Sequence, residues 1–383
     1  MSVTSAKGFR AAGIAAGIKA SGNADLALVV NDGPHTAAAG VFTSNRVKAA
    51  PVVWSEQVLK GGAVKAVVLN SGGANACTGP AGFQDTHKTA EQTAELLDAS
   101  AAEIAVCSTG LIGVRLPMDA LLSGLKTAAD ALAADGGLAA ATAIMTTDTV
   151  AKTAQAQGTG YVVGGMAKGA GMLAPGLATM LVVITTDAVA DADVLDTALR
   201  DATRVTFDRV DSDGCMSTND TVLLLASGAS ETVPDRAEFQ AAVTSVCADL
   251  ARQLVGDAEG ATKDIAVEVV RAAAEDQAVQ VARAVTRSNL FKCAMYGNDP
   301  NWGRVLSAVG TTDAEFEPDR LSVAINGVWV CRDGGVGDDR GLVDLTGREV
   351  KVTVDLAAGD ASATVWTNDL TPGYVHENSA YSS

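Results

Sequence analysis

The sequence predicts an α/β fold built from mixed sheets, and two observations support this prediction. Short β-branched apolar runs alternate with alanine-rich segments whose apolar residues recur every three or four positions, as in strands and amphipathic helices. The connections include both hairpin turns and crossovers, so antiparallel and parallel strand pairs are both expected. With 383 residues, 48% of them hydrophobic, the chain can form two or three units with substantial cores.

The expected elements cover most of the chain. We expect strands over residues 26–30, 38–43, 63–69, 104–108, 160–163, 180–186, 221–226, 265–270, 321–325, 328–331, 350–354 and 362–367, and a short strand-like run over 52–54. We expect helices over residues 83–97, 118–132, 138–145, 191–203, 236–255 and 276–287. Asn326-Gly327 should form a type I′ hairpin turn. The polar tail from Tyr374 should be frayed.

Charge and hydropathy narrow the class of protein. The formal net charge of −17 argues against nucleic acid or an anionic membrane as a partner, because phosphate binding requires clustered Lys and Arg. No apolar run reaches about 18 residues, so we expect no membrane span. The first residues lack a continuous apolar segment, so we also expect no secretory signal. These features predict a cytoplasmic protein.

The cysteines and histidines do not indicate a metal or cofactor site. The six cysteines, at positions 77, 107, 215, 247, 293 and 331, include no CxxC pair and are expected to be free thiols in a reducing compartment. His35, His87 and His376 stand in unrelated contexts, and the sequence contains no GxSxG or HExxH motif. Zinc, haem and iron–sulfur spacings are also absent. We therefore expect no metal and no bound cofactor, and chemistry that uses neither histidine nor a metal.

The stretch from Gly169 to Asp187 offers such chemistry. It begins as a glycine-rich loop and continues as a β-branched apolar run, and Thr179 stands at the junction, after Ala178. The threonine hydroxyl could attack the carbonyl of Ala178 and release a chain that begins with a nucleophile, whose new α-amine would be the general base. That amine has an unperturbed pKa of about 7.7–8.0, which suits a base near neutral pH. In proteins at large, a loop that simply enters a core strand is the commoner case.

Two glycine-containing segments follow predicted strands. Thr109-Gly110 ends the strand at 104–108, and a hydroxyl beside a flexible backbone N–H is the arrangement expected of an oxyanion hole. Residues 70–79, NSGGANACTG, follow the strand at 63–69 and either line a site with backbone donors or form a tight turn. This segment lacks the spacings of a nucleotide-binding loop.

Three further polar positions are candidate ligand contacts, each with a structural alternative. Thr146 opens the cluster Thr-Thr-Asp-Thr, which could bind a ligand or cap a turn. Lys168 is either a solvated surface residue or, if buried, an anchor for a carboxylate. The carboxylates between Gly256 and Gly260, including Glu259, are more often loop charges than ligand groups.

Ten segments, in order along nearly the whole chain, match one family. They are residues 40–51, 70–79, 107–113, 144–149, 167–172, 177–181, 213–220, 257–263, 299–304 and the tail from Asn378. On these segments the chain resembles the ornithine acetyltransferases, also called bifunctional glutamate N-acetyltransferase/amino-acid acetyltransferases of arginine biosynthesis. Two positions depart from the family pattern: Gly73 replaces a second Asn, and Asn298 stands where an acidic residue is commoner. Neither position is assigned to catalysis.

The resemblance implies a fold, a maturation step and a set of site residues. The implied fold is a layered, two-lobed arrangement, like that of the ornithine acetyltransferases and DmpA, of N-terminal-nucleophile type. Cleavage between Ala178 and Thr179 would give an α chain (1–178) and a β chain (179–383), which stay together, usually as an (αβ)2 heterotetramer. The implied nucleophile is Thr179, with Thr109 and Gly110 as the oxyanion hole. The implied substrate contacts are Thr146, Lys168, Thr179, Glu259, Asn378 and Ser383.

The implied reaction is a ping-pong transfer of acetyl from N-acetylornithine, through acetyl-Thr179, to glutamate. Acetyl-CoA is possible as a second acetyl donor. Two alternatives remain consistent with the residues. One is an N-terminal-nucleophile amidohydrolase or aminopeptidase on a related fold, in which water accepts the acyl group. The other is a catalytically silent binding protein in which the bond between Ala178 and Thr179 stays intact.

Overall fold

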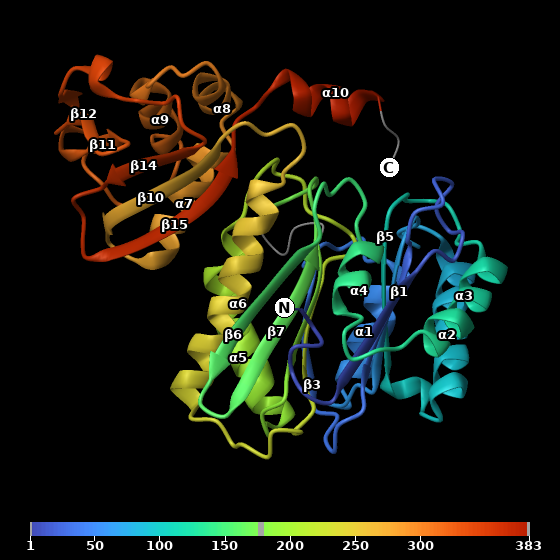
Figure 1. Ribbon diagram of the computed structural model, residues 1–383. Coiled ribbons are helices and arrows are strands. Elements are labelled where there is room, and N and C mark those ends of the chain that lie inside the picture. Colours follow the sequence, from blue (N-terminus) through green and yellow to red (C-terminus); the bar gives the residue numbers. More distant parts are fainter. Residues whose placement is uncertain (1, 175–179, 381–383) are drawn as a thin grey trace. The chain divides into compact units, whose positions relative to one another are not determined.

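The computed structural model describes residues 2–174 and 180–380, and the chain divides into two compact units (Figure 1). The first unit contains the chain up to Asp208 together with Cys215–Asp257. The second contains Arg209–Gly214 and the chain from Ala258 to Ser382. Both units combine mixed sheets with helices, which confirms the predicted α/β class.

The first unit is built on two sheets. The four-stranded sheet has the order β1 (Phe9–Ile14), β2 (Leu26–Asn31), β4 (Ala66–Ser71), β5 (Ile104–Thr109). The five-stranded sheet has the order β3 (Ala38–Phe42), β9 (Thr221–Ala226), β8 (Leu181–Thr186), β7 (Tyr161–Lys168), β6 (Lys152–Gly158). The β4–β5 and β8–β9 pairs are parallel, and the other pairs are antiparallel.

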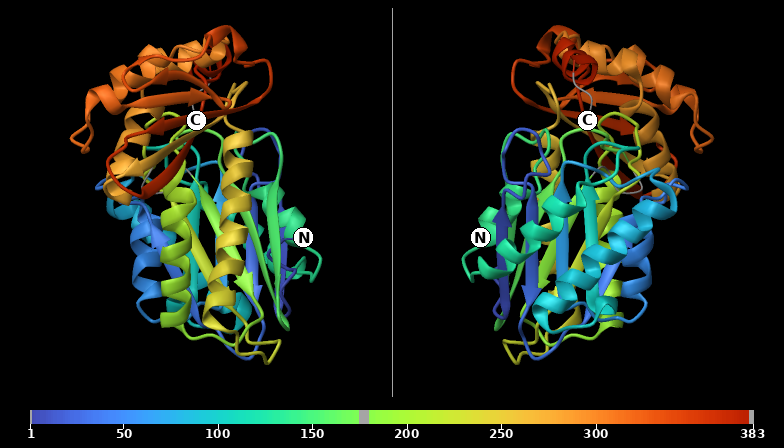
Figure 2. Two further views of the ribbon diagram at one scale, coloured as in Figure 1. Left: turned by 90° about the vertical axis from the view of Figure 1, so that its left-hand side faces the viewer. Right: turned by 90° about the vertical axis from the view of Figure 1, so that its right-hand side faces the viewer.

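The two sheets pack face to face and are covered by helices outside. Apolar residues of both sheets, among them Val67 and Val183, share one core cluster. Helices α2 (Gly79–Leu97) and α3 (Met118–Asp130) cover the outer face of the four-stranded sheet, and α5 (Ala192–Val205) and α6 (Arg236–Gly256) cover that of the five-stranded sheet (Figure 2). Helix α1 (Ala50–Leu59) packs on β5, and α4 (Gly137–Ala143) packs on β1. The unit therefore has four layers, and strands β2, β4, β5, β8 and β9 are buried along their whole length.

The register of the strands brings several strand ends together in this unit. Lys168, the last residue of β7, pairs with Leu181, the first of β8, and Leu181 pairs with Thr221, the first of β9. In the other sheet, β5 ends at Thr109, which pairs with Ser71 at the end of β4. The sequence-predicted Thr109 and Lys168 thus both lie where a strand gives way to a loop.

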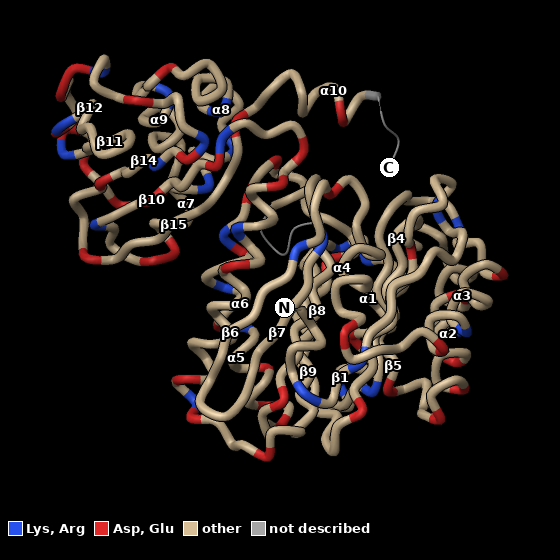
Figure 3. Tube along the Cα trace, viewed as in Figure 1, with Lys and Arg blue, Asp and Glu red and all other residues tan. Residues whose placement is uncertain are grey.

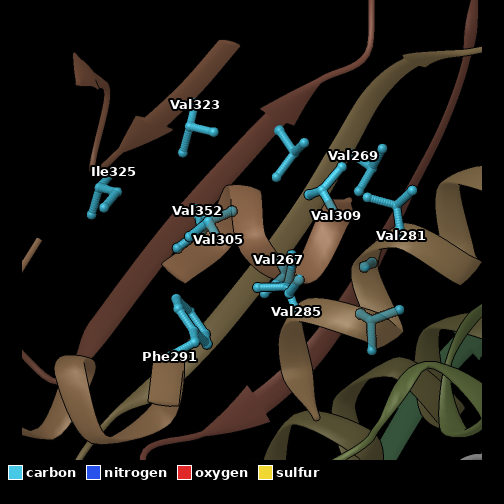
Figure 4. Packing of buried hydrophobic residues seen from close by; sticks show 14 of the residues in the cluster. Val267, Val269, Val281, Val285, Phe291, Val305, Val309, Val323, Ile325 and Val352 are labelled. Carbon is cyan, nitrogen blue, oxygen red and sulfur yellow. The ribbon is translucent and has the colours of Figure 1, made fainter. Parts of the chain in front are cut away.

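The second unit has one six-stranded sheet. Its order is β13 (Gly335–Val336), β12 (Val328–Arg332), β11 (Ser322–Ile325), β14 (Glu349–Asp355), β10 (Asp264–Ala272), β15 (Ala361–Asn368). Helices α7 (Glu275–Thr286), α8 (Asn289–Tyr296) and α9 (Trp302–Val309) complete its core, in which Val267, Val285, Phe291 and Val305 lie close together (Figure 4). Helix α10 (Pro372–Ala380) follows β15. The short 3-10 helices of the chain are η1 (Ala101–Glu103), η2 (Phe207–Arg209), η3 (Pro318–Arg320) and η4 (Arg340–Leu342).

Most predicted elements are confirmed, and local signals explain their positions. Helices α5 and α6 begin after Asp191 and Asp235, whose side chains accept backbone N–H bonds as N-caps. Asn326 and Gly327 have φ values of 47° and 84°, as the two central residues of a type I′ turn require. The strand-forming apolar runs around residues 181–186 and 221–226 are fully buried.

Two predictions of local structure were wrong. The strand-like run 52–54 lies inside α1, because Pro51 starts a helix and Val52, Ser55 and Val58 form its buried face. The tail from Tyr374 is helical in α10 rather than frayed, since the Thr371 hydroxyl accepts the Tyr374 N–H and so caps the helix. Strands β1 and β6 and helices α8 and α9 were not predicted, because their sequences are short, alanine-rich or polar.

Charged side chains lie mainly on the helices and loops of each unit, and few lie on the strands of the five-stranded sheet (Figure 3). Lys152 and Lys168, which are 0% and 2% exposed, are therefore unusual for this sheet. Within residues 2–174 and 180–380, no helix is long and apolar enough to cross a membrane.

Candidate active site

Gly110 follows β5 at a point where only glycine fits. Its φ of +128° is unfavourable for other residues, and a Cβ atom there would lie 2.6 Å from the backbone nitrogen of Gly73. The Thr109 carbonyl accepts the N–H groups of Gly72 and Gly73, at 2.9 and 3.0 Å. Among the described residues, none accepts a hydrogen bond from the Gly110 N–H. A backbone donor is therefore held rigidly and left available.

The first residues of the loop at 70–79 support Thr109 and Gly110. Its Gly72 and Gly73 N–H groups are used by Thr109, and its Ala74 N–H is donated to Leu111. The Asn70 amide donates to the Gly73 carbonyl at 3.0 Å. Residues 70–74 therefore position the Thr109-Gly110 backbone.

Lys168 is buried and lies beside Thr109. Its Nζ donates to the Thr109 Oγ1 at 3.4 Å, so the surface alternative for this lysine is wrong. An ammonium group can only donate, so the Thr109 oxygen acts as the acceptor. The Thr109 hydroxyl hydrogen thus stays available to a second acceptor. Two donors, this hydroxyl and the Gly110 N–H, come from adjacent residues at the end of β5.

A second buried group, Asp148, organises the loops around Lys168. Its Oδ1 accepts the Gly169 N–H at 2.6 Å and a Lys152 Nζ bond at 2.7 Å. Its Oδ2 accepts the Thr146 N–H at 2.9 Å. Burial alone would raise the pKa of the Asp148 carboxyl, but the charges of Lys168 and Lys152 outweigh it and lower the pKa to about 2. Asp148 is therefore a stable anion at neutral pH.

The Asp148 cluster includes a second carboxylate, that of Asp257. Lys152 also bonds to Asp257 Oδ2 at 2.5 Å, and Asp257 accepts both the backbone N–H and the hydroxyl of Thr149. The buried lysine is thus paired on both sides, as a buried charge requires. Thr146 lies on the loop that this cluster fixes. Asp148 accepts backbone N–H groups of that loop, as the turn-capping alternative predicted, and its carboxylate also interacts with the charge of Lys168.

Lys19 is a partly buried lysine near Lys168 that the sequence analysis did not single out. It donates to the carbonyls of Met145 and Ala24, at 2.6 and 3.1 Å. Its pKa is lowered by burial, and the charge of Lys168 lowers it further. The carboxylates of Asp25 and Asp148 act in the opposite direction. Lys19 and Lys168 therefore lie among both positive and negative groups near the loop that carries Thr146. Nothing in the local sequence around Lys19 signals this position.

Asp220, the residue before β9, is fully buried next to β8. Its Oδ1 accepts the Met180 N–H at 3.0 Å. Its Oδ2 is buried without a hydrogen-bond partner among the described residues. Burial raises the pKa of this carboxyl well above its usual value, and the Met180 N–H offsets that effect only in part. Asp220 was within a matched segment, but its burial could not be read from the sequence.

Glu259 and Asn378 meet in the second unit. The Asn378 amide donates to the Glu259 Oε2 at 2.9 Å, and also to the Tyr374 carbonyl at 3.0 Å. The structure thus brings together two residues that are 119 positions apart. Glu259 is held by a neutral amide, so its negative charge is not cancelled by this contact.

Three predicted site residues, Ala178, Thr179 and Ser383, lie outside the described residues. The residue that follows Thr179, Met180, is described and fully buried, with its N–H on Asp220. Within the described part of the chain, no group of three or more His, Cys, Asp or Glu side chains could hold a metal ion.

Comparisons with known proteins agree with the matched segments. A family model described as the ArgJ family matches residues 10–383. The arginine biosynthesis bifunctional protein ArgJ of Streptomyces coelicolor is 72% identical over 100% of both chains, and that of Thermobifida fusca is 68% identical over 100% of both. A crystal structure of ornithine acetyltransferase complexed with ornithine, from Mycobacterium tuberculosis, is similar at 57% identity over 47% of this chain and 96% of that chain, with a TM-score of 0.43.

Proposed function

The chain belongs to the ArgJ family and is an acyltransferase of arginine biosynthesis, and from this premise we propose that it cleaves itself before Thr179 and then transfers acetyl from N-acetylornithine to glutamate. Small molecules are its substrates. The observation that carries the proposal is the pair of available donors at the end of β5, the Thr109 hydroxyl and the Gly110 N–H. Such donors stabilise the negative oxygen that develops when a nucleophile adds to a carbonyl.

In the proposed maturation, the Thr179 hydroxyl adds to the Ala178 carbonyl. The bond between Ala178 and the Thr179 nitrogen breaks, the nitrogen takes up a proton, and water hydrolyses the resulting ester. The products are an α chain of residues 1–178 and a β chain of residues 179–383. The new α-amine of Thr179 then acts as the general base for its own hydroxyl.

The proposed turnover has two half-reactions. Thr179 attacks the acetyl carbonyl of N-acetylornithine, the oxygen becomes negative beside Thr109 and Gly110, and ornithine leaves with a proton on its nitrogen. The amine of glutamate then attacks the acetyl-threonine ester, and N-acetylglutamate leaves as the threonine hydroxyl regains its proton. Acetyl-CoA would supply the same ester in a second activity.

In this proposal each substrate contact pairs a charged group of the substrate with a residue of opposite charge or with a hydrogen-bonding neighbour. The buried Lys168 suits the α-carboxylate that both substrates carry, and Thr146 lies on the loop fixed by Asp148. Glu259 suits the side-chain ammonium of N-acetylornithine, with Asn378 as its hydrogen-bonding neighbour. We assign a further contact to Ser383.

The sheet topology supports association of the two chains after cleavage. In the five-stranded sheet, β3, β6 and β7 would belong to the α chain, and β8 and β9 to the β chain. Strand β8 pairs with β7 over six residue pairs, and β9 pairs with β3 over five. Separating the chains would break both ladders and expose a shared core, so we propose that they stay together, as an (αβ)2 heterotetramer.

Product analysis tests the transfer reaction. The purified protein is incubated with N-acetylornithine, with and without glutamate, and the products are quantified by mass spectrometry. We expect ornithine and N-acetylglutamate in equal amounts when glutamate is present, and little ornithine beyond the first turnover without it. Release of acetate at an unchanged rate without glutamate would identify a hydrolase and overturn the proposal.

A further inference from the structure

We propose that Asp220 is the proton donor of the self-cleavage step, an assignment that rests on the proposed function. Its carboxylic acid would give a proton to the Thr179 nitrogen as the bond from that nitrogen to the Ala178 carbon breaks. The resulting carboxylate would then take the proton that the Thr179 hydroxyl lost on adding to the carbonyl. The net change is the transfer of one proton from oxygen to nitrogen, so no external acid is consumed.

The first argument is position. Asp220 Oδ1 accepts the Met180 N–H at 3.0 Å, and Met180 is joined by a peptide bond to Thr179. The Asp220 backbone is fixed as well, because its carbonyl accepts the Thr43 N–H at 3.0 Å and the next residue, Thr221, donates its N–H to the Met180 carbonyl at 3.2 Å. The carboxyl group is therefore held at the start of β8 and cannot turn away from it.

The second argument is the remaining oxygen. Asp220 is 0% exposed, and its Oδ2 has no hydrogen-bond partner among the described residues. A buried carboxylate with an unsatisfied oxygen is costly, whereas a protonated carboxyl carries an O–H that can be donated. Buried polar groups without partners are uncommon and call for an explanation. A carboxylic acid that donates its proton to the neighbouring peptide bond during self-cleavage would explain why the Asp220 Oδ2 has no partner among the described residues.

The surroundings of the carboxyl favour its neutral form. Burial raises the pKa of Asp220 well above the usual range, and the negative charge of Asp208 raises it further. The Met180 N–H, the nearby Ser217 hydroxyl and the positive charge of Lys168, at the end of β7, act in the opposite direction. The net effect is a raised pKa, so the group can be protonated at a pH where ordinary carboxyls are ionised.

A purely structural role for Asp220 is the alternative, since its bond to Met180 alone could order the start of β8. An Asn side chain can keep that bond through its oxygen but cannot act as an acid. The second unit offers a matched control: Asp211 is also buried, has an unpartnered Oδ1 and a raised pKa, and its Oδ2 accepts the Arg287 Nε at 2.7 Å.

The experiment follows self-cleavage of the full chain made by cell-free translation, in a pulse-chase across pH, with denaturing electrophoresis. We expect Asp220→Asn to slow cleavage by about 10²–10⁴-fold, as for loss of a general acid, while Asp211→Asn cleaves at the wild-type rate. The wild-type rate should fall as pH rises through the Asp220 pKa, and Asp220→Asn should lose that dependence. Asp220→Glu, which restores an acid, should recover part of the rate.

The possible failures are distinguishable. If the wild-type chain never cleaves, the proposed function fails. If the wild type cleaves and Asp220→Asn cleaves equally fast, the assignment of Asp220 fails. If Asp220→Asn is slow but has the wild-type pH profile, the residue only positions Met180, and the assignment also fails. Circular dichroism of each chain establishes that a slow variant is folded.

Discussion

Asp148 and Asp220 are both buried in the first unit and both interact with the charge of Lys168, yet their surroundings act in opposite directions. Asp148 accepts two backbone N–H bonds and a lysine bond, and its pKa falls to about 2. Asp220 accepts one backbone N–H, has an oxygen without a partner among the described residues, and its pKa rises. The charges of two neighbouring lysines, together with the additional hydrogen-bond donors, therefore keep Asp148 ionised, whereas burial dominates at Asp220 and favours its protonated form.

The largest expected effect concerns the fixed charge. Asp148→Asn removes the anion between Lys152 and Lys168, so both ammonium groups lose a buried partner. We expect the free energy of unfolding at pH 7 to fall by about 3–5 kcal/mol, measured by urea denaturation. Asp338→Asn, which removes an exposed pair with Arg332, should cost about 1 kcal/mol or less. Equal losses for the two variants would show that Asp148 is not a structural anion.

A somewhat smaller effect concerns turnover. Thr109→Ala removes one of the two donors at the end of β5, and we expect kcat to fall by about 10²–10³-fold because the oxyanion is less stabilised. Turnover is measured as N-acetylglutamate formed from N-acetylornithine and glutamate. Thr142→Ala, an exposed threonine on α4 that bonds only its own helix, serves as the control and should retain wild-type turnover. Undiminished turnover of Thr109→Ala would remove Thr109 from the oxyanion hole.

The pH dependence of stability separates the two carboxyls. A carboxyl whose pKa is lower in the folded protein than in the unfolded chain, where it is about 3.9, stabilises the fold at pH values above that. This stabilisation is lost as the pH falls through the pKa of the folded state. For Asp148 the loss should occur between about pH 4 and pH 2 and amount to about 2–3 kcal/mol. Urea denaturation from pH 5 to pH 2 checks this. The difference in the free energy of unfolding between wild type and Asp148→Asn should shrink by that amount over this range, and a constant difference would contradict the lowered pKa.

The smallest expected effect has the opposite sign. A carboxyl with a raised pKa leaves the fold most stable below the unfolded value, about 3.9, and stability is lost as pH rises toward the folded pKa. The Asn side chain at position 220 cannot ionise. The free energy of unfolding of Asp220→Asn should therefore fall less than that of wild type as pH rises from 4 to 8. Thermal unfolding of the two uncleaved chains, each also carrying Thr179→Ala, measures the difference. A difference in Tm that does not change with pH would mean that Asp220 is not neutral in the fold.

The sequence singled out the candidate site residues but not the contacts that hold them. Thr109, Gly110 and Lys168 were each recognisable beside a strand end, but their separation by about 60 positions hides the 3.4 Å contact between Lys168 and Thr109. That contact depends on how two sheets pack, which no local pattern encodes.

Other parts of the candidate site could not be predicted for a related reason. Asp220 stands beside an apolar strand, where a carboxylate could equally cap a turn or face solvent. Its role depends on burial and on the Met180 N–H, and both arise from the pairing of β8 with β9. In the fold, α1 was mistaken in part for a strand because β-branched residues follow Pro51, although the helix is determined by its buried face.

The most direct test of the central claim is the intact mass of the purified protein under denaturing conditions, for wild type and for Thr179→Ala. We expect wild type to give two chains, with an N-terminal sequence that begins at Thr179 in the second, and the variant to give a single 38.6 kDa chain. Both wild-type chains should elute together from size exclusion under native conditions. A single 38.6 kDa chain from wild type, or cleavage that persists in Thr179→Ala, would contradict the account.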